Sequence, residues 1–359
     1  MEKEDGKQIE LDGTTIKAFC ECEPSLGGSG HKPVYVQPKT QLTFSDRERL
    51  AGFYRRAYPD GDIIGSVIMG CGDYWLKFWC EEGGHFVFRL RGCNSRRFCP
   101  TCADKYKRLK SSHALDVFRG LTSVYSGRVY LIHVVITFPK ELWGEVAKDV
   151  DKAFDLVYRL FRYSGGGISG GVVALHLWHT SAPLSGLFPH FHVIVPNVVV
   201  RRGGCGDYLQ RVRPYFNLDL FKWRFKSELL MTYNFRADEV DVHFEYCRLD
   251  NFARAKHLLN YAFRLPIEDL YPYLHGGLSE AEVQFARYLL DFKGHRIRWF
   301  GFLADGVKSR YVKAFIRFDE WFKKYGNLCP IHHTKLKLLE KWLDRPPPNA
   351  VCLNVMRKC

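Results

Sequence analysis

One short segment constrains the fold most tightly: residues 189–196, which read Pro-His-Phe-His-Val-Ile-Val-Pro. Aromatic and β-branched residues favour a strand, in which successive side chains point to opposite faces. His190 and His192 therefore share one face, while Phe191 and Val193 pack on the other. Two imidazoles so placed can bind one cation and leave positions open for a substrate. The alternative is a pair of strand histidines with ordinary hydrogen bonds.

Strand-like and helix-like segments follow one another along most of the chain. Apolar or alternating runs predict strands over residues 129–138, 172–180, 191–200 and 239–246. Amphipathic spacing predicts helices over residues 45–56, 103–120, 142–163, 218–233, 251–263 and 279–292, and Ser45 is the expected cap of the first. A Gly-rich turn at 165–171 precedes the second strand, and the second and third strands have hairpin-like spacing. The chain is therefore predicted to form an α+β fold.

A cysteine-rich segment precedes the predicted sheet. Cys93, Cys99 and Cys102 lie within ten residues and include the Cys-x-x-Cys knuckle typical of structural zinc. Such a site is a closed tetrahedron, so a fourth ligand is needed. We favour Cys80, with Cys71 and His85 as substitutes. The alternative is a set of unrelated buried thiols, and Cys329 with His332 and His333 is a weaker second metal candidate.

The strand before the paired histidines offers a third ligand for the same cation. It carries His176 and His179 and could return antiparallel beside His190 and His192. We favour His179 because it lies nearest the turn, and His176 is the alternative. Imidazole ligands favour a borderline metal such as manganese over magnesium.

The predicted helix over residues 251–263 separates into two faces. Its apolar residues form one side, and Arg254, His257, Tyr261 and Arg264 form a narrow stripe opposite. Cationic neighbours would favour the phenolate of Tyr261 and hold a phosphate for its attack. The alternative is a solvated basic face.

The charge and composition narrow the class of partner and the compartment. Lys and Arg outnumber Asp and Glu by 53 to 39, a formal net charge of +14, which favours a polyanionic partner. Arg96 and Arg97, on the predicted zinc loop, are suited to phosphate contacts. No apolar run is long enough to span a bilayer, and the charged N-terminus lacks the pattern of a signal peptide. We therefore expect a cytoplasmic protein with no membrane partner, in which cysteines bind metal.

Together these motifs resemble the HUH endonuclease superfamily, and most closely the rolling-circle replication initiators of archaeal plasmids and the IS91-like transposases. The resemblance runs in order through most of residues 80–310. It is carried by the cysteine knuckle at 93–102, His133-Val-Val-Ile-Thr-Phe-Pro139, His190-Phe-His192, Tyr261-Ala-Phe-Arg264 and the basic segment 294–303. The fold implied is a central antiparallel sheet with flanking helices, preceded by a small zinc-binding module.

The activity that the resemblance implies is a nick in single-stranded DNA at a plasmid or viral origin. Its cofactors would be catalytic Mg²⁺ or Mn²⁺ and structural Zn²⁺, and Tyr261 would stay joined to the 5′ end of the DNA and later rejoin it without ATP. Two departures stand out. His257 occupies the place of the second tyrosine of IS91-like transposases, which favours a replication initiator. Arg264 stands where the family usually has lysine, and its pKa is too high for proton donation.

The predicted organisation has four parts. Residues 1–70 form an N-terminal arm and helix, 71–112 the zinc module, 113–270 the nuclease domain and 271–359 a basic helical region. The sequence contains no Gly-x-x-x-x-Gly-Lys-Ser/Thr loop, so strand separation is expected to need a host helicase. The alternatives to a replication initiator are a single-tyrosine transposase and a non-catalytic zinc-containing DNA-binding repressor.

Overall fold

A computed structural model describes residues 42–57, 61–72, 75–122, 129–164, 167–179, 186–204, 206–213, 216–271, 296–304, 335–342 and 351–353, with a few isolated positions between 279 and 320. The predicted helix at 279–292 falls largely outside these residues, as does the metal candidate formed by Cys329, His332 and His333.

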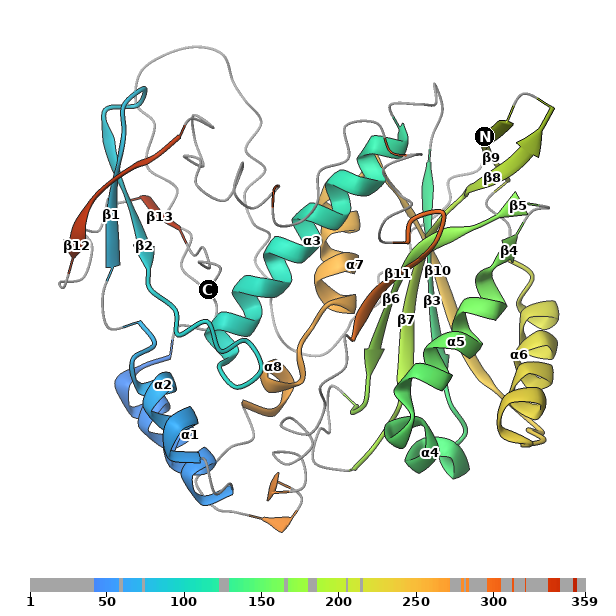
Figure 1. Ribbon diagram of the computed structural model, residues 1–359, viewed down its shortest axis with the longest axis horizontal. Helices are drawn as coiled ribbons and strands as arrows, with labels where there is room; N and C mark the ends of the chain where they lie inside the picture. Colours follow the sequence, from blue (N-terminus) through green and yellow to red (C-terminus); the bar gives the residue numbers. More distant parts are fainter. Residues whose placement is uncertain are drawn as a thin grey trace, which may run out of the picture.

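A five-stranded sheet dominates the described part of the chain, with strand order β10-β3-β7-β6-β11 (Figure 1). The strands are β3 (Tyr130–Thr137), β6 (Gly170–His176), β7 (His190–Pro196), β10 (Asp241–Arg248) and β11 (Ile297–Gly301). Every neighbouring pair in this sheet is antiparallel. The structure is therefore mixed α+β, as predicted.

Helices cover both faces of this sheet (Figure 1). On one face, residues such as Val134, Val173 and Phe191 share a buried core with α5 (Val150–Phe161) and α6 (Leu218–Tyr233). On the other, α3 (Pro100–Thr122) and α7 (Phe252–Ala262) pack over Val172 and Ile194. The alternation of side chains along each strand produces these two cores, because odd and even positions face opposite layers.

Several predicted elements are divided in the structure. The helix predicted over 142–163 is a short 3₁₀ turn (Lys140–Leu142) followed by α4 (Trp143–Lys148) and α5, because Asp149 leaves helical geometry and its side chain caps Lys152 N–H. The strand predicted over 191–200 is β7 and β8 (Val198–Gly203), separated at Asn197, whose side chain bonds the backbone of Tyr130 and Val212. Local side-chain hydrogen bonds thus end elements that the apolar pattern alone would continue.

The hairpin of β8 with β9 (Gly206–Arg211) extends from a second sheet, which also contains β4 (Tyr163–Ser164) and β5 (Gly167–Ile168). The Gly-rich turn predicted at 165–171 therefore includes β5 and the start of β6.

The N-terminal part contains α1 (Phe44–Ala57) and α2 (Gly61–Met69), of which only the first was predicted. Its cap is Thr43 rather than Ser45: the Thr43 hydroxyl accepts a hydrogen bond from Asp46 N–H, and the Asp46 carboxylate accepts one from Thr43 N–H. This reciprocal pair is a capping box, and Ser45 lies inside the first turn because the helix already begins at Phe44.

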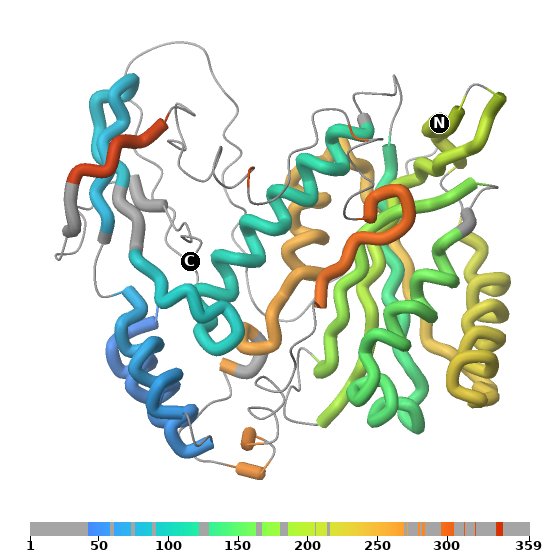
Figure 2. Tube along the Cα trace, in the orientation of Figure 1, coloured from blue at the N-terminus to red at the C-terminus, as the bar shows by residue number. Residues whose placement is uncertain are grey.

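The chain beyond residue 271, predicted to be helical, contributes three strands. β11 pairs with β6 and completes the main sheet, as the orange segment near residue 300 shows in Figure 2. β12 (Lys337–Trp342) and β13 (Val351–Leu353) flank the hairpin of β1 (Trp75–Cys80) and β2 (His85–Leu90). Residues distant in sequence thus complete both the predicted nuclease domain and the cysteine-rich part. No described helix combines the length and apolar character needed to cross a bilayer.

Candidate metal centres and nucleophile

Four cysteine side chains converge beside the start of α3. Cys71, Cys93, Cys99 and Cys102 each offer a sulfur, and all four sulfurs lie within 4.8 Å of one another. The Sγ–Sγ distances are 3.5 Å for Cys71–Cys99, 3.8 Å for Cys71–Cys102 and 3.6 Å for Cys93–Cys102. Four sulfurs held about 2.3 Å from one zinc ion would lie about 3.8 Å apart. The spacing therefore matches a metal tetrahedron and is far too long for disulfides, whose sulfurs are about 2.05 Å apart.

Local backbone geometry brings these sulfurs together. Cys99 immediately precedes α3, and Cys102 lies in its first turn. Gly92 passes so close to the cluster that a Cβ there would lie 2.8 Å from Cys102 Sγ, and Asn94 adopts a φ of 60°. Glycine and asparagine are the residues that tolerate such close approach and left-handed geometry. The conformation of the segment that leads from Gly92 to Cys99 is thus determined by its own residues.

The thiols compete for charge when they are crowded in this way. Hydrogen bonds from Cys71, Cys93 and Cys99 lower the pKa of Cys102, and their hydrogen bonds with Cys102 raise the pKa of Cys93 and Cys99. A bound cation would stabilise all four as thiolates. The donor set therefore suits a soft or borderline metal ion.

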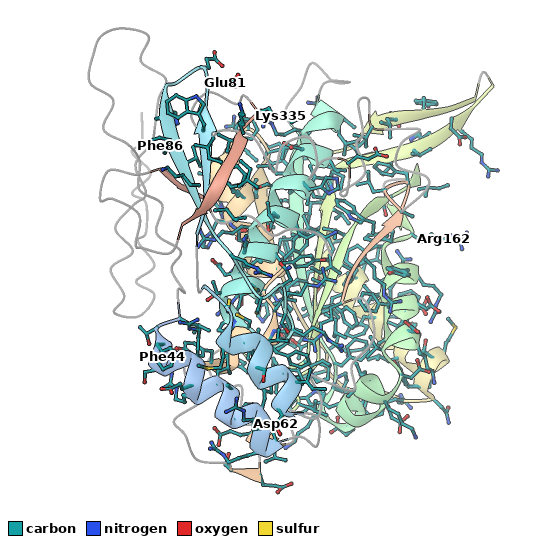
Figure 3. All side chains as sticks on the ribbon, turned by 60° about the vertical axis from the view of Figure 1, so that its left-hand side comes forward. Phe44, Asp62, Glu81, Phe86, Arg162 and Lys335 are labelled. Carbon is teal, nitrogen blue, oxygen red and sulfur yellow. The ribbon has the colours of Figure 1, made fainter. Side chains whose placement is uncertain are left out.

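The fourth cysteine of the group is Cys71, not the favoured Cys80. Cys80 is buried at the end of β1 in a small apolar cluster with Phe78 and Val87. Because β1 runs away from the knuckle, its end lies by the hairpin turn. In Figure 3, Glu81 in that turn lies at the opposite end of this region from Phe44 and Asp62 on α1 and α2. His85 begins the returning strand beside Cys80 and is likewise remote from the cluster.

Cys71→Ala and Cys80→Ala form a matched pair, since both remove a buried thiol. We expect zinc to stay with the Cys80→Ala protein through gel filtration and to be lost from Cys71→Ala, because a structural site needs all four ligands. Metal analysis of the purified proteins measures this. Equal zinc content in the two variants would contradict the assignment.

Three histidines converge on the face of the main sheet that α7 overlies. His176 ends β6 and lies directly across from His190, which begins β7, and His192 follows on the same face. Their candidate ligand atoms lie within 4.8 Å of one another, and the side chains are buried, with exposures of 6 %, 6 % and 2 %. The ring centroids are 4.3–5.2 Å apart. This group could hold a metal ion.

The third histidine is His176 rather than His179. β6 ends at His176, so His179 lies beyond the strand, is exposed and packs against Phe188 with ring centroids 5.2 Å apart. The strand register distinguishes the two histidines, because it pairs His176 with His190 and ends there, before His179.

Burial keeps the three imidazoles neutral. It lowers the pKa of His190 to about 4 and the pKa values of His176 and His192 well below the ordinary value. The charges of Arg264 and Arg296 add to the lowering at His176. Neutral imidazole is the form that ligates a metal.

Hydrogen bonds orient each of the three rings. His176 Nε2–H donates to the carbonyl of Ala262 at 2.9 Å, and His190 Nδ1–H donates to that of Phe188 at 2.8 Å. His192 Nδ1 lies 2.9 Å from Nε2 of His133, while its Nε2 is buried without a hydrogen-bond partner. A buried ring nitrogen with no partner, close to candidate ligand atoms of two other histidines, is what a metal ligand presents.

Tyr261 lies against this histidine group, near the end of α7. Its ring centroid is 5.1 Å from that of His192 and 6.5 Å from that of His176, and the side chain is 38 % exposed. The apolar residues of α7 hold the helix on the sheet, and Tyr261 is off that buried face, as the helical spacing predicted. The ring of Tyr261 thus lies beside the buried imidazoles and is itself exposed to solvent.

The other residues of the predicted stripe occupy different positions. Arg264 lies just beyond the helix end and is half-buried. Its charge contributes to the lowered pKa of His176. His257 is exposed one turn before Tyr261. Arg254 contacts Glu245 of β10 at 3.4 Å. Sequence reasoning missed the contact of His133 with His192, and it missed Glu245 altogether; only the strand register relates them to the site.

No family model, curated protein or solved structure matches the chain in comparisons with known proteins, so a functional assignment has to be argued from the chemistry of these two groups.

Proposed function

We propose that the protein is a metal-dependent DNA-nicking enzyme of HUH type, which uses Tyr261 to attack single-stranded DNA and serves as a rolling-circle replication initiator. The observation that carries the proposal is the meeting of Tyr261 with the three-histidine group, 5.1 Å between the rings of Tyr261 and His192. A nucleophile beside a candidate cation site supplies the two components that phosphodiester cleavage requires.

We infer that His176, His190 and His192 hold Mn²⁺ or Mg²⁺, with waters and a DNA phosphate as the remaining ligands. When bound, the ion would polarise the scissile phosphate and stabilise the charge that develops on its oxygens. Three imidazoles make Mn²⁺ the better match, because Mg²⁺ prefers oxygen ligands. Zn²⁺ is assigned to the four cysteines, whose thiolates suit it.

The residues of the chain would divide the remaining work. The Tyr261 oxygen forms a bond to phosphorus as the bond from phosphorus to the 3′ oxygen breaks, which leaves a 5′-phosphotyrosine and a free 3′-hydroxyl. His257, one turn earlier on the helix, would accept the phenolic proton, and the departing oxygen would take a proton from water. Arg264 would bind the phosphate through its charge. One phosphodiester replaces another, so rejoining needs no ATP.

The basic surface supports a DNA partner. The net charge is +14, and Arg96 and Arg97 are exposed on the knuckle that the cysteines hold. Arg96 also stacks on Tyr106, with 4.1 Å from Cζ to the ring centroid, which fixes its direction. Phosphate contacts of this kind position a strand without reading its sequence.

Incubation with single-stranded origin DNA and Mn²⁺ tests the proposal. A protein–DNA adduct that survives denaturation is expected with Mn²⁺, and none is expected with EDTA. DNA binding without any adduct would instead favour a non-catalytic DNA-binding repressor.

The choice between His176 and His179 gives a second test. We expect His176→Ala to weaken Mn²⁺ binding by more than the roughly 100-fold that loss of an outer-shell partner costs at most, because it removes a direct ligand. His179→Ala should leave Mn²⁺ affinity unchanged, since His179 is exposed beyond the end of β6. Mn²⁺ titration followed by electron paramagnetic resonance measures both affinities. A loss of affinity in His179→Ala but not in His176→Ala would show that His179 is the third ligand.

A further inference from the structure

A chain of hydrogen bonds leads from the histidine group across the sheet. His192 Nδ1 lies 2.9 Å from His133 Nε2, and His133 Nδ1 lies 3.0 Å from Glu245 Oε1. The three residues come from the adjacent strands β7, β3 and β10, with Glu245 directly opposite His133. The rings of His133 and His192 are nearly parallel, 15° apart, and His133 is only 4 % exposed. The strand register therefore builds a continuous path from the buried group to the half-exposed carboxylate.

The carboxylate of Glu245, at the end of this hydrogen-bond path, determines which ring nitrogen of each histidine carries a proton. An ionised carboxylate accepts hydrogen bonds and donates none, so His133 must carry its proton on Nδ1. When His133 carries that proton alone, its Nε2 is an acceptor, and His192 donates from Nδ1. The Nε2 of His192 is left as a bare lone pair, and this is the atom that the structure buries without a hydrogen-bond partner. The chain thus selects the one tautomer of His192 whose Nε2 can ligate a metal.

The carboxylate is also held from the helix that carries Tyr261. Arg254 of α7 lies 3.4 Å from the second oxygen of Glu245, and hydrogen bonds from His133 and Arg254 both favour the charged form of that carboxyl group. Arg254 precedes Tyr261 by two helical turns on the same stripe. Glu245 therefore connects the orientation of His192 with the position of α7.

We propose that His133 and Glu245 are positioning residues that fix the tautomer and the direction of the metal ligand His192. This inference rests on the proposed metal centre and adds a function for two residues that do not touch the metal. Outer-shell partners of a ligating histidine typically change metal affinity by about 10–100-fold.

The test uses the full chain with three variants and one control. His133→Phe keeps a ring of similar size and removes both hydrogen bonds, Glu245→Ala removes the acceptor, and Glu245→Gln keeps an oxygen that can accept from His133. The control is His243→Ala. His243 also pairs with a carboxylate on β10, that of Asp241 at 2.9 Å, but it is not part of the hydrogen-bond path from His192 to Glu245.

Mn²⁺ affinity is one readout, and the other is the protonated nitrogen of His192 in ¹⁵N-histidine NMR spectra of the metal-free protein. We expect about 10–100-fold weaker Mn²⁺ binding in His133→Phe and a loss in the same direction in Glu245→Ala, with affinity near that of the wild type in Glu245→Gln and His243→Ala. His192 should carry its proton on Nδ1 in the wild type and lose this preference in His133→Phe. If His133→Phe does not fold, Glu245→Ala decides the Mn²⁺ comparison, because that carboxylate is half-exposed.

The outcomes separate this inference from the proposed function. If the wild type binds Mn²⁺ and forms the DNA adduct, but His133→Phe and Glu245→Ala bind Mn²⁺ as tightly as His243→Ala, the positioning chain is refuted and the nicking function stands. A wild-type protein with His192 protonated on Nε2 also refutes it. If the wild type binds no Mn²⁺, the metal centre fails and the inference falls with it.

Discussion

Tyr261→Phe is expected to abolish the covalent protein–DNA adduct while DNA and Mn²⁺ binding persist. Removing the phenolic oxygen deletes the atom that would bond to phosphorus, and loss of an enzyme nucleophile costs at least about 10⁴-fold in rate. The ring itself remains, so its contact with His192 and the packing of α7 are retained. Denaturing gel electrophoresis of protein incubated with labelled single-stranded DNA measures the loss.

A second exposed tyrosine supplies the control. Tyr208 on β9 is 49 % exposed, and its hairpin lies in a different sheet from the histidine group. Tyr208→Phe should form as much adduct as the wild type. If Tyr261→Phe retains the adduct, the nucleophile is another residue and the role given to α7 is wrong.

Removal of zinc is expected to unfold the cysteine-rich part of the protein. Structural zinc contributes about 10–16 kcal/mol in isolated zinc-finger peptides, which is comparable with the roughly 5–15 kcal/mol that stabilises a whole domain. Cys71, Cys99 and Cys102 belong to the same buried cluster as Leu50 and Tyr54 of α1, so loss of the ion should expose α1 and the start of α3 together. Hydrogen exchange followed by mass spectrometry, before and after treatment with a strong zinc chelator, measures this.

The same measurement contains its own comparison. Strands β3 and β7 should keep their protection, because each is hydrogen-bonded to a neighbouring strand on both sides within the main sheet. Unchanged exchange in α1 and α3 after complete zinc removal would show that the cysteines are buried thiols without a structural ion.

The sequence predicted which face of a strand or helix carries each site residue better than it predicted which distant residues that face contacts. Alternation along 189–196 correctly placed His190 and His192 on one strand face, and the spacing of α7 correctly put Tyr261 off its buried side. Both are local properties of a strand or a helix, which a short stretch of sequence determines. The knuckle of Cys93, Cys99 and Cys102 is local in the same sense.

The two favoured residues that lie outside the metal-binding groups, Cys80 and His179, were chosen where non-local geometry decides, and the alternatives Cys71 and His176 lie in those groups. Cys71 and Cys80 are separated by the β1 strand, and only the direction of that strand shows that Cys80 is carried away from the knuckle. His176 and His179 differ by three positions, and the choice between them required the register of β6 on β7. A period of two identifies the face of a strand but not where the strand ends.

His133 and Glu245 were beyond sequence reasoning for a similar reason. Their contact joins β3 to β10 across more than a hundred residues, and nothing in either local pattern pairs them. The strands β12 and β13 are a further example, since they reach the hairpin of β1 and β2 from the far end of the chain.

Identification of the residue joined to DNA tests the central claim most directly. The adduct formed with Mn²⁺ would be digested with protease and nuclease, and the modified peptide sequenced by mass spectrometry. We expect a nucleotide attached through its 5′ phosphate to Tyr261, formed with Mn²⁺ and absent after His176→Ala. An adduct on another side chain, or one that forms equally well in EDTA, would contradict the account.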